Sequence, residues 1–234
     1  MVGMSDIEQI FGQWLDGFTF LPDSSSPRSD KAGKIIDKVS VAAGAKPVNL
    51  LGSGDQGIAF KTDQDTVLKF TFDVQEARLW VQSGDIEGLA PVKGVYILSS
   101  SKTGNTIIYA VHVEYIKGAL DDKQVKLIRD ALAKSRQKLT TYMNPNDTPE
   151  QYQIKRTRSL IHAFDDVARV DSAFKLVPEL LRQLWQRDRN YIYDLGPTNF
   201  RVNDKGLVVV IDPSVPDRHK EDPVIDRIMF EKAK

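Results

Sequence analysis

Residues 52–70 read GSGDQGIAFKTDQDTVLKF, and this stretch combines a turn rich in glycine with a lysine inside an apolar run. Gly52, Gly54 and Gly57 precede a β-rich run that begins at Ile58, so the turn leads into a strand. Glycine has no Cβ atom, so such a turn can lie close to a bound anion and offer it backbone N–H groups. On the turn alone, an ordinary glycine-rich hairpin is an equally good interpretation.

Two other phosphate-binding motifs begin with similar glycines and do not fit. A dinucleotide-binding loop must open a helix, because the helix N-terminus meets the pyrophosphate. Here the glycines are followed by Ile58, Ala59 and Phe60, which favour a strand. A P-loop needs a Gly-Lys-Ser/Thr sequence after its glycines, and none follows. The pattern therefore favours a hairpin that covers a phosphate group.

Lys69 is the second informative residue, because it interrupts the apolar run 67–70. A lysine on such a strand can neutralise phosphate groups as a point charge. It then needs an anionic partner, and Glu76, early in a helix expected near residues 73–82, is the candidate we favour. Asp73 is the competing candidate. The alternative interpretation is an edge-strand lysine that only prevents aggregation.

Polar residues far downstream complete the pattern. Asp194 and Asn199 lie on either side of a tight Gly196-Pro197 loop, and Asp212 ends an apolar strand. An aspartate in such a loop can accept the proton of an incoming hydroxyl group. Asparagine and aspartate oxygens suit Mg²⁺ that bridges phosphates. Taken separately, each aspartate could also be a simple cap or turn residue.

In this order the residues resemble the protein-kinase-like superfamily, over about residues 48–214. The resemblance implies an α+β, bilobal fold in which a small antiparallel sheet lobe precedes a truncated helical lobe. It also implies ATP and Mg²⁺ as cofactors. By the same resemblance, Asp194 and Lys69 are catalytic and Asn199 and Asp212 bind the metal. The implied nucleotide-binding residues are Gly52, Ser53, Gly54, Gly57, Ala59, Lys69, Glu76, Glu114 and Ile116, the last two through the backbone of a hinge.

The departures from the family pattern indicate which members of the superfamily the chain resembles more. Ile192-Tyr193 stand where protein kinases have His-Arg, and Pro213-Ser214 replace Phe-Gly after Asp212. Only 22 residues follow Asp212, too few for the peptide-binding half of a protein-kinase helical lobe. The loop around Asp194 is closer to small-molecule and atypical kinases, such as aminoglycoside and choline phosphotransferases.

The hydrophobic periodicity predicts the remaining organisation of the chain. We expect an N-terminal helical extension at 1–46, a sheet lobe at 47–117 and a helical lobe at 118–234. The expected helices are 6–18, 30–44, 73–82, 121–142, one ending near 170, and 172–188. The expected strands are 58–60, 67–70, 92–98, 107–115, 200–202 and 207–211.

Composition excludes several other classes of protein. The 32 Lys and Arg residues balance 32 Asp and Glu residues, so no nucleic acid is expected as a partner. No run of about 18 apolar residues predicts a membrane helix, and no basic and apolar N-terminal segment predicts a signal peptide. The chain has no cysteine, which excludes disulfides and thiolate metal sites. We expect a cytoplasmic protein without a membrane partner.

The sequence thus predicts an ATP-dependent enzyme, an atypical kinase. It would transfer the γ-phosphoryl group to a hydroxyl acceptor, which could be a protein or a small molecule. The alternative is a pseudokinase-like binding or regulatory module that acts by docking a partner. The loss of the residues flanking Asp194 and Asp212 supports that alternative.

Overall fold

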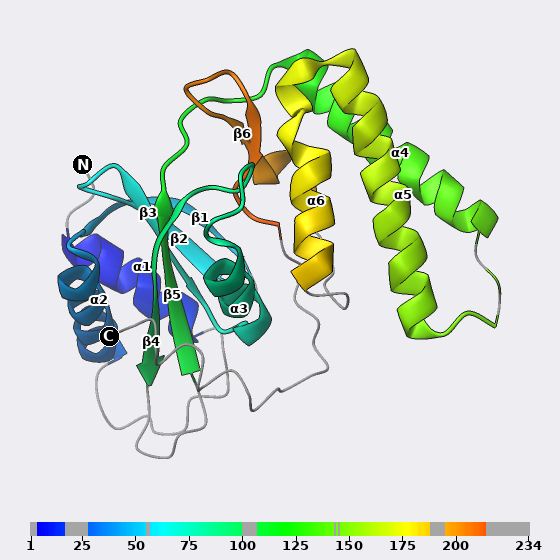
Figure 1. Cartoon of the computed structure of the whole chain (residues 1–234). Coiled ribbons are helices and arrows are strands. Elements are labelled where there is room, and N and C mark those ends of the chain that lie inside the picture. Colours follow the sequence, from blue (N-terminus) through cyan, green and yellow to red (C-terminus); the bar gives the residue numbers. More distant parts are fainter. Residues whose placement is uncertain are drawn as a thin grey trace. The chain divides into compact units, whose positions relative to one another are not determined.

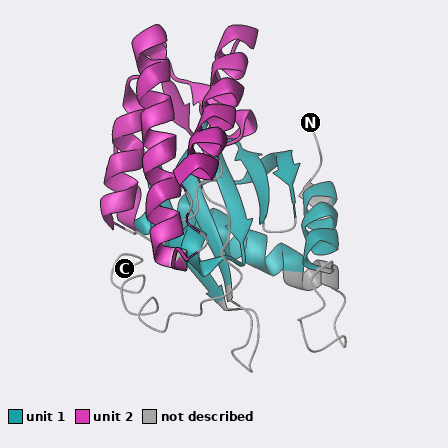
Figure 2. Ribbon diagram, turned by 90° about the vertical axis from the view of Figure 1, so that its right-hand side faces the viewer, with its two compact units in different colours: residues 1–81, 91–115, 219–234 teal, residues 82–90, 116–218 magenta. Residues whose placement is uncertain are grey.

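The computed structural model describes residues 4–16, 28–54, 57–99, 107–142, 144, 146–187 and 195–213 (Figure 1). These residues form two compact units (Figure 2). The first, called the sheet unit here, contains the described residues up to Val81 together with Pro91–Tyr115. The second, the helical unit, contains Gln82–Ala90 and the described residues from Ile116 onward.

The sheet unit is built on five antiparallel strands in the order β1-β2-β3-β5-β4. The strands are β1 (Pro47–Ser53), β2 (Gly57–Thr62), β3 (Thr66–Thr71), β4 (Val92–Ser99) and β5 (Ile107–Glu114). Helix α3 (Val74–Ser83) lies between β3 and β4 in the sequence. Strand β1 was not expected, and it makes the glycine turn shorter, because Gly52 and Ser53 lie in the strand.

Two N-terminal helices, α1 (Met4–Asp16) and α2 (Arg28–Ala43), pack against one face of this sheet (Figure 1). Side chains alternate between the faces of a strand, so one face of β2 and β3 is apolar apart from the buried Thr62 and Thr66. That face carries Ile58, Phe60, Leu68 and Phe70, which are at most 1% exposed. They form one core with the apolar faces of α1 and α2. The opposite face packs on α3 through a smaller cluster around Ala77 and Tyr109.

The helical unit contains α4 (Asp122–Tyr142), α5 (Pro149–Val170) and α6 (Leu176–Arg187). Helices α4 and α5 pack closely where the Ser159 hydroxyl donates to the Ser135 carbonyl oxygen at 2.7 Å. The single helix expected at 172–188 is divided. A 3-10 turn, η1 (Ser172–Phe174), comes first, because Asp171 accepts the Ala173 N–H and starts a separate turn.

A two-stranded ribbon completes the helical unit. A 3-10 turn, η2 (Pro197–Asn199), leads into β6 (Phe200–Val202), which pairs with β7 (Val208–Val210). The β7 strand also bonds to the segment 88–90, since the Val210 N–H donates to Gly88 at 2.8 Å and Val210 accepts from Ala90 at 3.0 Å.

This is the α+β architecture expected from the sequence, with a small antiparallel sheet that carries one helix and a helical region after it. Within the described part of the chain, no helix is both long enough and apolar enough to cross a membrane.

Candidate functional site

Cross-strand pairing places the glycine segment and Lys69 in one row across the sheet. Gly52 pairs with Ala59, Ala59 pairs with Lys69, and Lys69 pairs with Val111. Directly opposite residues in antiparallel strands lie on the same face of the sheet. Ala59 and Lys69 are half-buried, whereas the other face is sealed by α1 and α2. At these positions the face shared by Ala59 and Lys69 is therefore the less buried of the two.

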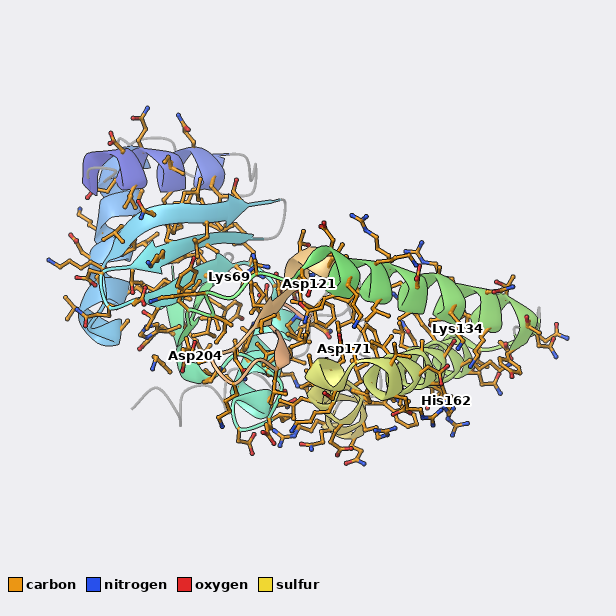
Figure 3. The ribbon with its side chains drawn as sticks, turned by 90° about the horizontal axis from the view of Figure 1, so that it is seen from above. Lys69, Asp121, Lys134, His162, Asp171 and Asp204 are labelled. Atoms are coloured by element: carbon orange, nitrogen blue, oxygen red, sulfur yellow. The ribbon has the colours of Figure 1, made fainter. Side chains whose placement is uncertain are left out.

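Lys69, which is labelled in Figure 3, forms an ion pair with Glu76, with Nζ and Oε1 2.6 Å apart. The Glu76 side chain is only 2% exposed and that of Lys69 19% exposed. A buried carboxylate is costly without a cation, so this pair fixes the lysine ammonium group next to α3. The edge-strand interpretation of Lys69 is wrong, because β3 lies between β2 and β5.

The two carboxylates considered for Lys69 have different environments. Asp73 Oδ1 accepts the backbone N–H of Gln75 at 2.8 Å, as expected of a side chain that caps the start of α3. Glu76 lies one turn further into the helix, where Oε1 also accepts the indole N–H of Trp80 at 3.4 Å. The sequence analysis assigned no role to Trp80, although its spacing of four residues from Glu76 predicts this contact on a helix.

The glycines of the turn differ in what surrounds them. A Cβ atom at Gly57 would come within 2.8 Å of the Phe70 carbonyl oxygen and 3.2 Å of Lys69 Cε, so glycine is needed there for close approach. A Cβ atom at Gly52 or Gly54 would have no heavy atom within 4 Å. The packing of the described residues does not account for those two glycines, because the space beside them is open.

The segment expected to be a hinge, 111–118, begins within β5 and continues beyond its end at Glu114. The Glu114 N–H donates to the Pro91 carbonyl oxygen at 2.9 Å, so this donor is used within the sheet unit. Ile116 is 9% exposed. In the helical unit, Gly118 accepts the Val202 N–H at 2.8 Å, and a Cβ atom at Gly118 would lie 2.2 Å from the Val202 carbonyl oxygen. Gly118 therefore joins this segment to the β6–β7 ribbon.

The candidate metal-binding residues lie at one end of that ribbon. The Ile211 N–H donates to the Asn199 carbonyl oxygen at 2.8 Å, which extends the β6–β7 pairing by one step. The backbone of Asn199 is therefore adjacent to the residue before Asp212, and both side chains are half-buried. Arg201 Nη1 donates to the carbonyl oxygens of Thr198 (3.0 Å) and Phe200 (2.7 Å), on either side of Asn199. The sequence analysis did not single out this arginine.

The side-chain oxygens of Asn199 and Asp212 suit an Mg²⁺ ion that is also coordinated by a bound ligand. Within residues 195–213 and the other described ranges, no group of three or more His, Cys, Asp or Glu residues could form a metal site by itself. Mg²⁺ is usually held by one or two carboxylates together with substrate phosphates and water. Asn199 and Asp212 supply oxygens of the right kind for that arrangement. Asp194, the expected catalytic aspartate, lies outside the described residues.

Comparisons with known proteins show likeness to solved structures but not to family models or curated proteins. No protein-family model matches the chain, and no curated protein matches it. Among solved structures, the chain is similar to the GDP and kanamycin complex of APH(2")-IIia. The match covers 80% of this chain and 77% of that chain, at 16% sequence identity and a TM-score of 0.30. A likeness this distant leaves activity to be argued from the residues themselves.

Proposed function

We propose that this chain is an ATP- and Mg²⁺-dependent phosphotransferase, an atypical kinase that transfers the γ-phosphoryl group to a hydroxyl acceptor. The observation that carries the proposal is the 2.6 Å ion pair between Lys69 on β3 and the buried Glu76 on α3. Kinases place a strand lysine against a helix glutamate so that the ammonium group is held ready for nucleotide phosphates. Here the lysine also lies opposite Ala59, next to the glycine segment.

The proposed roles follow from what each side chain can do. Lys69 holds the phosphates by charge, and the glycine turn contributes backbone N–H groups at close range. Ala59 is small enough to let an adenine ring lie against the sheet, with the backbone near Glu114 and Ile116 at its edge. Because the Glu114 N–H is already used by Pro91, we assign that residue no donor role toward adenine.

In the helical unit, Asn199 and Asp212 would hold Mg²⁺, which when bound neutralises charge that develops on the phosphates. Asp194 would accept a proton from the acceptor hydroxyl and orient it toward the phosphorus atom. Phosphoryl transfer needs little more than this positioning and charge stabilisation. The acceptor, a protein or a small molecule, is not specified by any of these residues.

Binding of ATP·Mg²⁺ by isothermal titration calorimetry tests the proposal first. We expect the wild-type protein to bind and Lys69→Met to bind at least about 10-fold more weakly, because loss of a buried charge-assisted contact costs about 1.5–3 kcal/mol. Lys126→Met is a matched control, since Lys126 is an exposed residue of α4 that pairs only with its helix neighbour Asp130 among the contacts seen. A wild-type protein that does not bind ATP·Mg²⁺ would contradict the proposal.

Release of labelled phosphate from γ-labelled ATP then separates an enzyme from a binding module. We expect slow hydrolysis or self-labelling by the wild type and loss of this turnover in Asp194→Asn, with ATP affinity retained. Tight ATP binding with no turnover under any condition would favour the alternative, a pseudokinase-like module that acts through a partner.

A further inference from the structure

The N-terminal helix α1 contacts the glycine turn directly. The indole Nε1–H of Trp14, in the last turn of α1, donates to the carbonyl oxygen of Gly54 at 3.2 Å. The two residues are 40 positions apart, so the contact exists only because α1 packs on the sheet. Trp14 is 9% exposed whereas Gly54 is exposed, so the donor side of this hydrogen bond is shielded from water and the acceptor side is not.

The indole ring is held in place by aromatic neighbours. It stacks on Phe72, with centroids 4.7 Å apart and planes at 17°, and on Phe11, at 5.6 Å and 25°. Phe72 directly follows β3, the strand that carries Lys69. Offset stacking of this kind adds to the energy of burial and restricts the ring. The N–H donor therefore has a fixed position relative to β3.

The turn itself has few other restraints among its described residues. The Gly54 N–H donates to the Gly57 carbonyl oxygen at 2.9 Å, which closes the turn. Gly54 has no side chain, and the space around its Cα is open. An unrestrained glycine has more conformational freedom than any other residue. A hydrogen bond to its carbonyl group is therefore an effective way to fix the turn.

We propose that Trp14 is a positioning residue that sets the glycine turn for phosphate binding. The proposal rests on the nucleotide-binding function argued above. The indole N–H holds the Gly54 carbonyl oxygen on the α1 side of the turn. This oxygen carries a partial negative charge and would repel phosphate oxygens if it faced them. The indole also fixes the turn relative to Lys69, whose Cε lies 3.2 Å from where a Gly57 Cβ would be. The helical extension would then be part of the ATP-binding apparatus.

The substitution Trp14→Phe tests this, because phenylalanine keeps an aromatic ring for stacking but has no N–H group. We expect the Kd for ATP·Mg²⁺ to rise about 3- to 10-fold, the range that corresponds to one hydrogen bond. The Kd for adenosine, which has no phosphate, should not change. Trp185→Phe, the same exchange in α6 of the helical unit, is the control and should alter neither Kd.

Hydrogen–deuterium exchange of the ligand-free protein provides a second readout that needs no nucleotide. We expect faster exchange in a peptide spanning 50–60 for Trp14→Phe and unchanged exchange in α4 and α5. An unchanged Kd for ATP·Mg²⁺, an equal rise for adenosine, or a raised Kd without faster exchange at the turn overturns the role of Trp14. None of these results affects the proposed function, which is tested by ATP·Mg²⁺ binding and turnover in the wild type. If the wild type does not bind ATP·Mg²⁺, the proposed function fails and the phosphate-positioning role fails with it.

Discussion

At the scale of single residues, the ion pair of Lys69 and Glu76 is asymmetric. The Glu76 side chain is 2% exposed, whereas that of Lys69 is 19% exposed and has a long flexible stem. When its partner is removed, a lysine can turn its ammonium group toward water, but the buried carboxylate cannot reach it. The cost of breaking the pair therefore depends on which residue is replaced.

We expect Lys69→Met to lower the free energy of unfolding by about 3 kcal/mol, the cost typical of leaving a buried charge unpaired. Glu76→Gln should cost less, and the double variant less than the sum of the two. Urea denaturation of the four proteins at one pH measures all three quantities. Additive effects would show that the carboxylate and the ammonium group do not depend on each other.

His112 is a buried residue whose titration bears on stability. Burial, and secondarily the positive charge of Lys93, lowers its pKa below the usual value of 6.5. Its Nε2 lies 2.7 Å from the Thr66 hydroxyl, within the face that packs on α1 and α2. A histidine with a lowered pKa in the folded state binds fewer protons there than when unfolded, so stability must fall as pH falls below about 6.5.

We therefore expect the wild type to lose stability between pH 7.5 and 5.5 relative to His112→Gln. The loss is bounded at about 1.4 kcal/mol per pH unit for one proton. Because the other two histidines are present in both proteins, their contributions cancel in the difference. Urea denaturation at the two pH values gives this difference. A constant difference would mean that His112 takes up its proton as readily in the folded protein as in the unfolded one.

At the scale of elements, the start of α5 illustrates how local sequence determines a boundary. Thr148 accepts the Gln151 N–H at 3.2 Å, and the Gln151 side chain accepts the Thr148 N–H at 2.9 Å. This is a reciprocal capping box with proline at the first helical position. The sequence predicts one helix that ends at 142 and another that ends near 170, and the cap fixes where the second helix begins.

Replacing the capping residue should destabilise the helical unit measurably. We expect Thr148→Ala to cost about 1 kcal/mol in the free energy of unfolding. Thr140→Ala in α4 is the matched control, because Thr140 is an exposed helix residue whose hydroxyl bonds back to Arg136. That exchange should be neutral or slightly stabilising, since alanine favours helix more than threonine does. Equal losses in the two variants would argue against a capping role.

The same local signals explain which parts of the structure could be predicted from sequence. The apolar alternation at 67–70 and the helix near 73–82 are confirmed as β3 and α3, and the partner of Lys69 followed from their short connection. Strand β1 was missed because most of it is exposed, and it is held mainly by pairing with β2. The contact of Trp14 with Gly54 depends on packing across 40 residues, which no local pattern encodes.

At the scale of the molecule, the question is whether the N-terminal extension folds independently of the sheet. The division at residue 46 remains a prediction. Against an independent extension, Phe11 is 0% exposed and packs 4.6 Å from Phe70 and 6.4 Å from Phe60, ring centroid to ring centroid. Without α1 and α2, the apolar face of β2 and β3 would be exposed to water. Such a face would favour aggregation, so the helices and the sheet should fold together.

The substitution Phe11→Ala tests this cooperativity. Removing a fully buried phenylalanine ring costs about 3–5 kcal/mol, through lost burial and the cavity that remains. If the helices and the sheet are one cooperative unit, the whole loss appears as an earlier, still single, unfolding transition of the sheet unit. Val170→Ala, at a side chain 67% exposed in α5, should change stability by less than about 0.5 kcal/mol.

If instead Phe11→Ala releases α1 and α2 at low denaturant while the sheet unfolds at its original midpoint, the extension is a separable domain. In that case Trp14 could leave the glycine turn without unfolding the sheet, and the affinity for ATP·Mg²⁺ would fall in parallel with the release of α1.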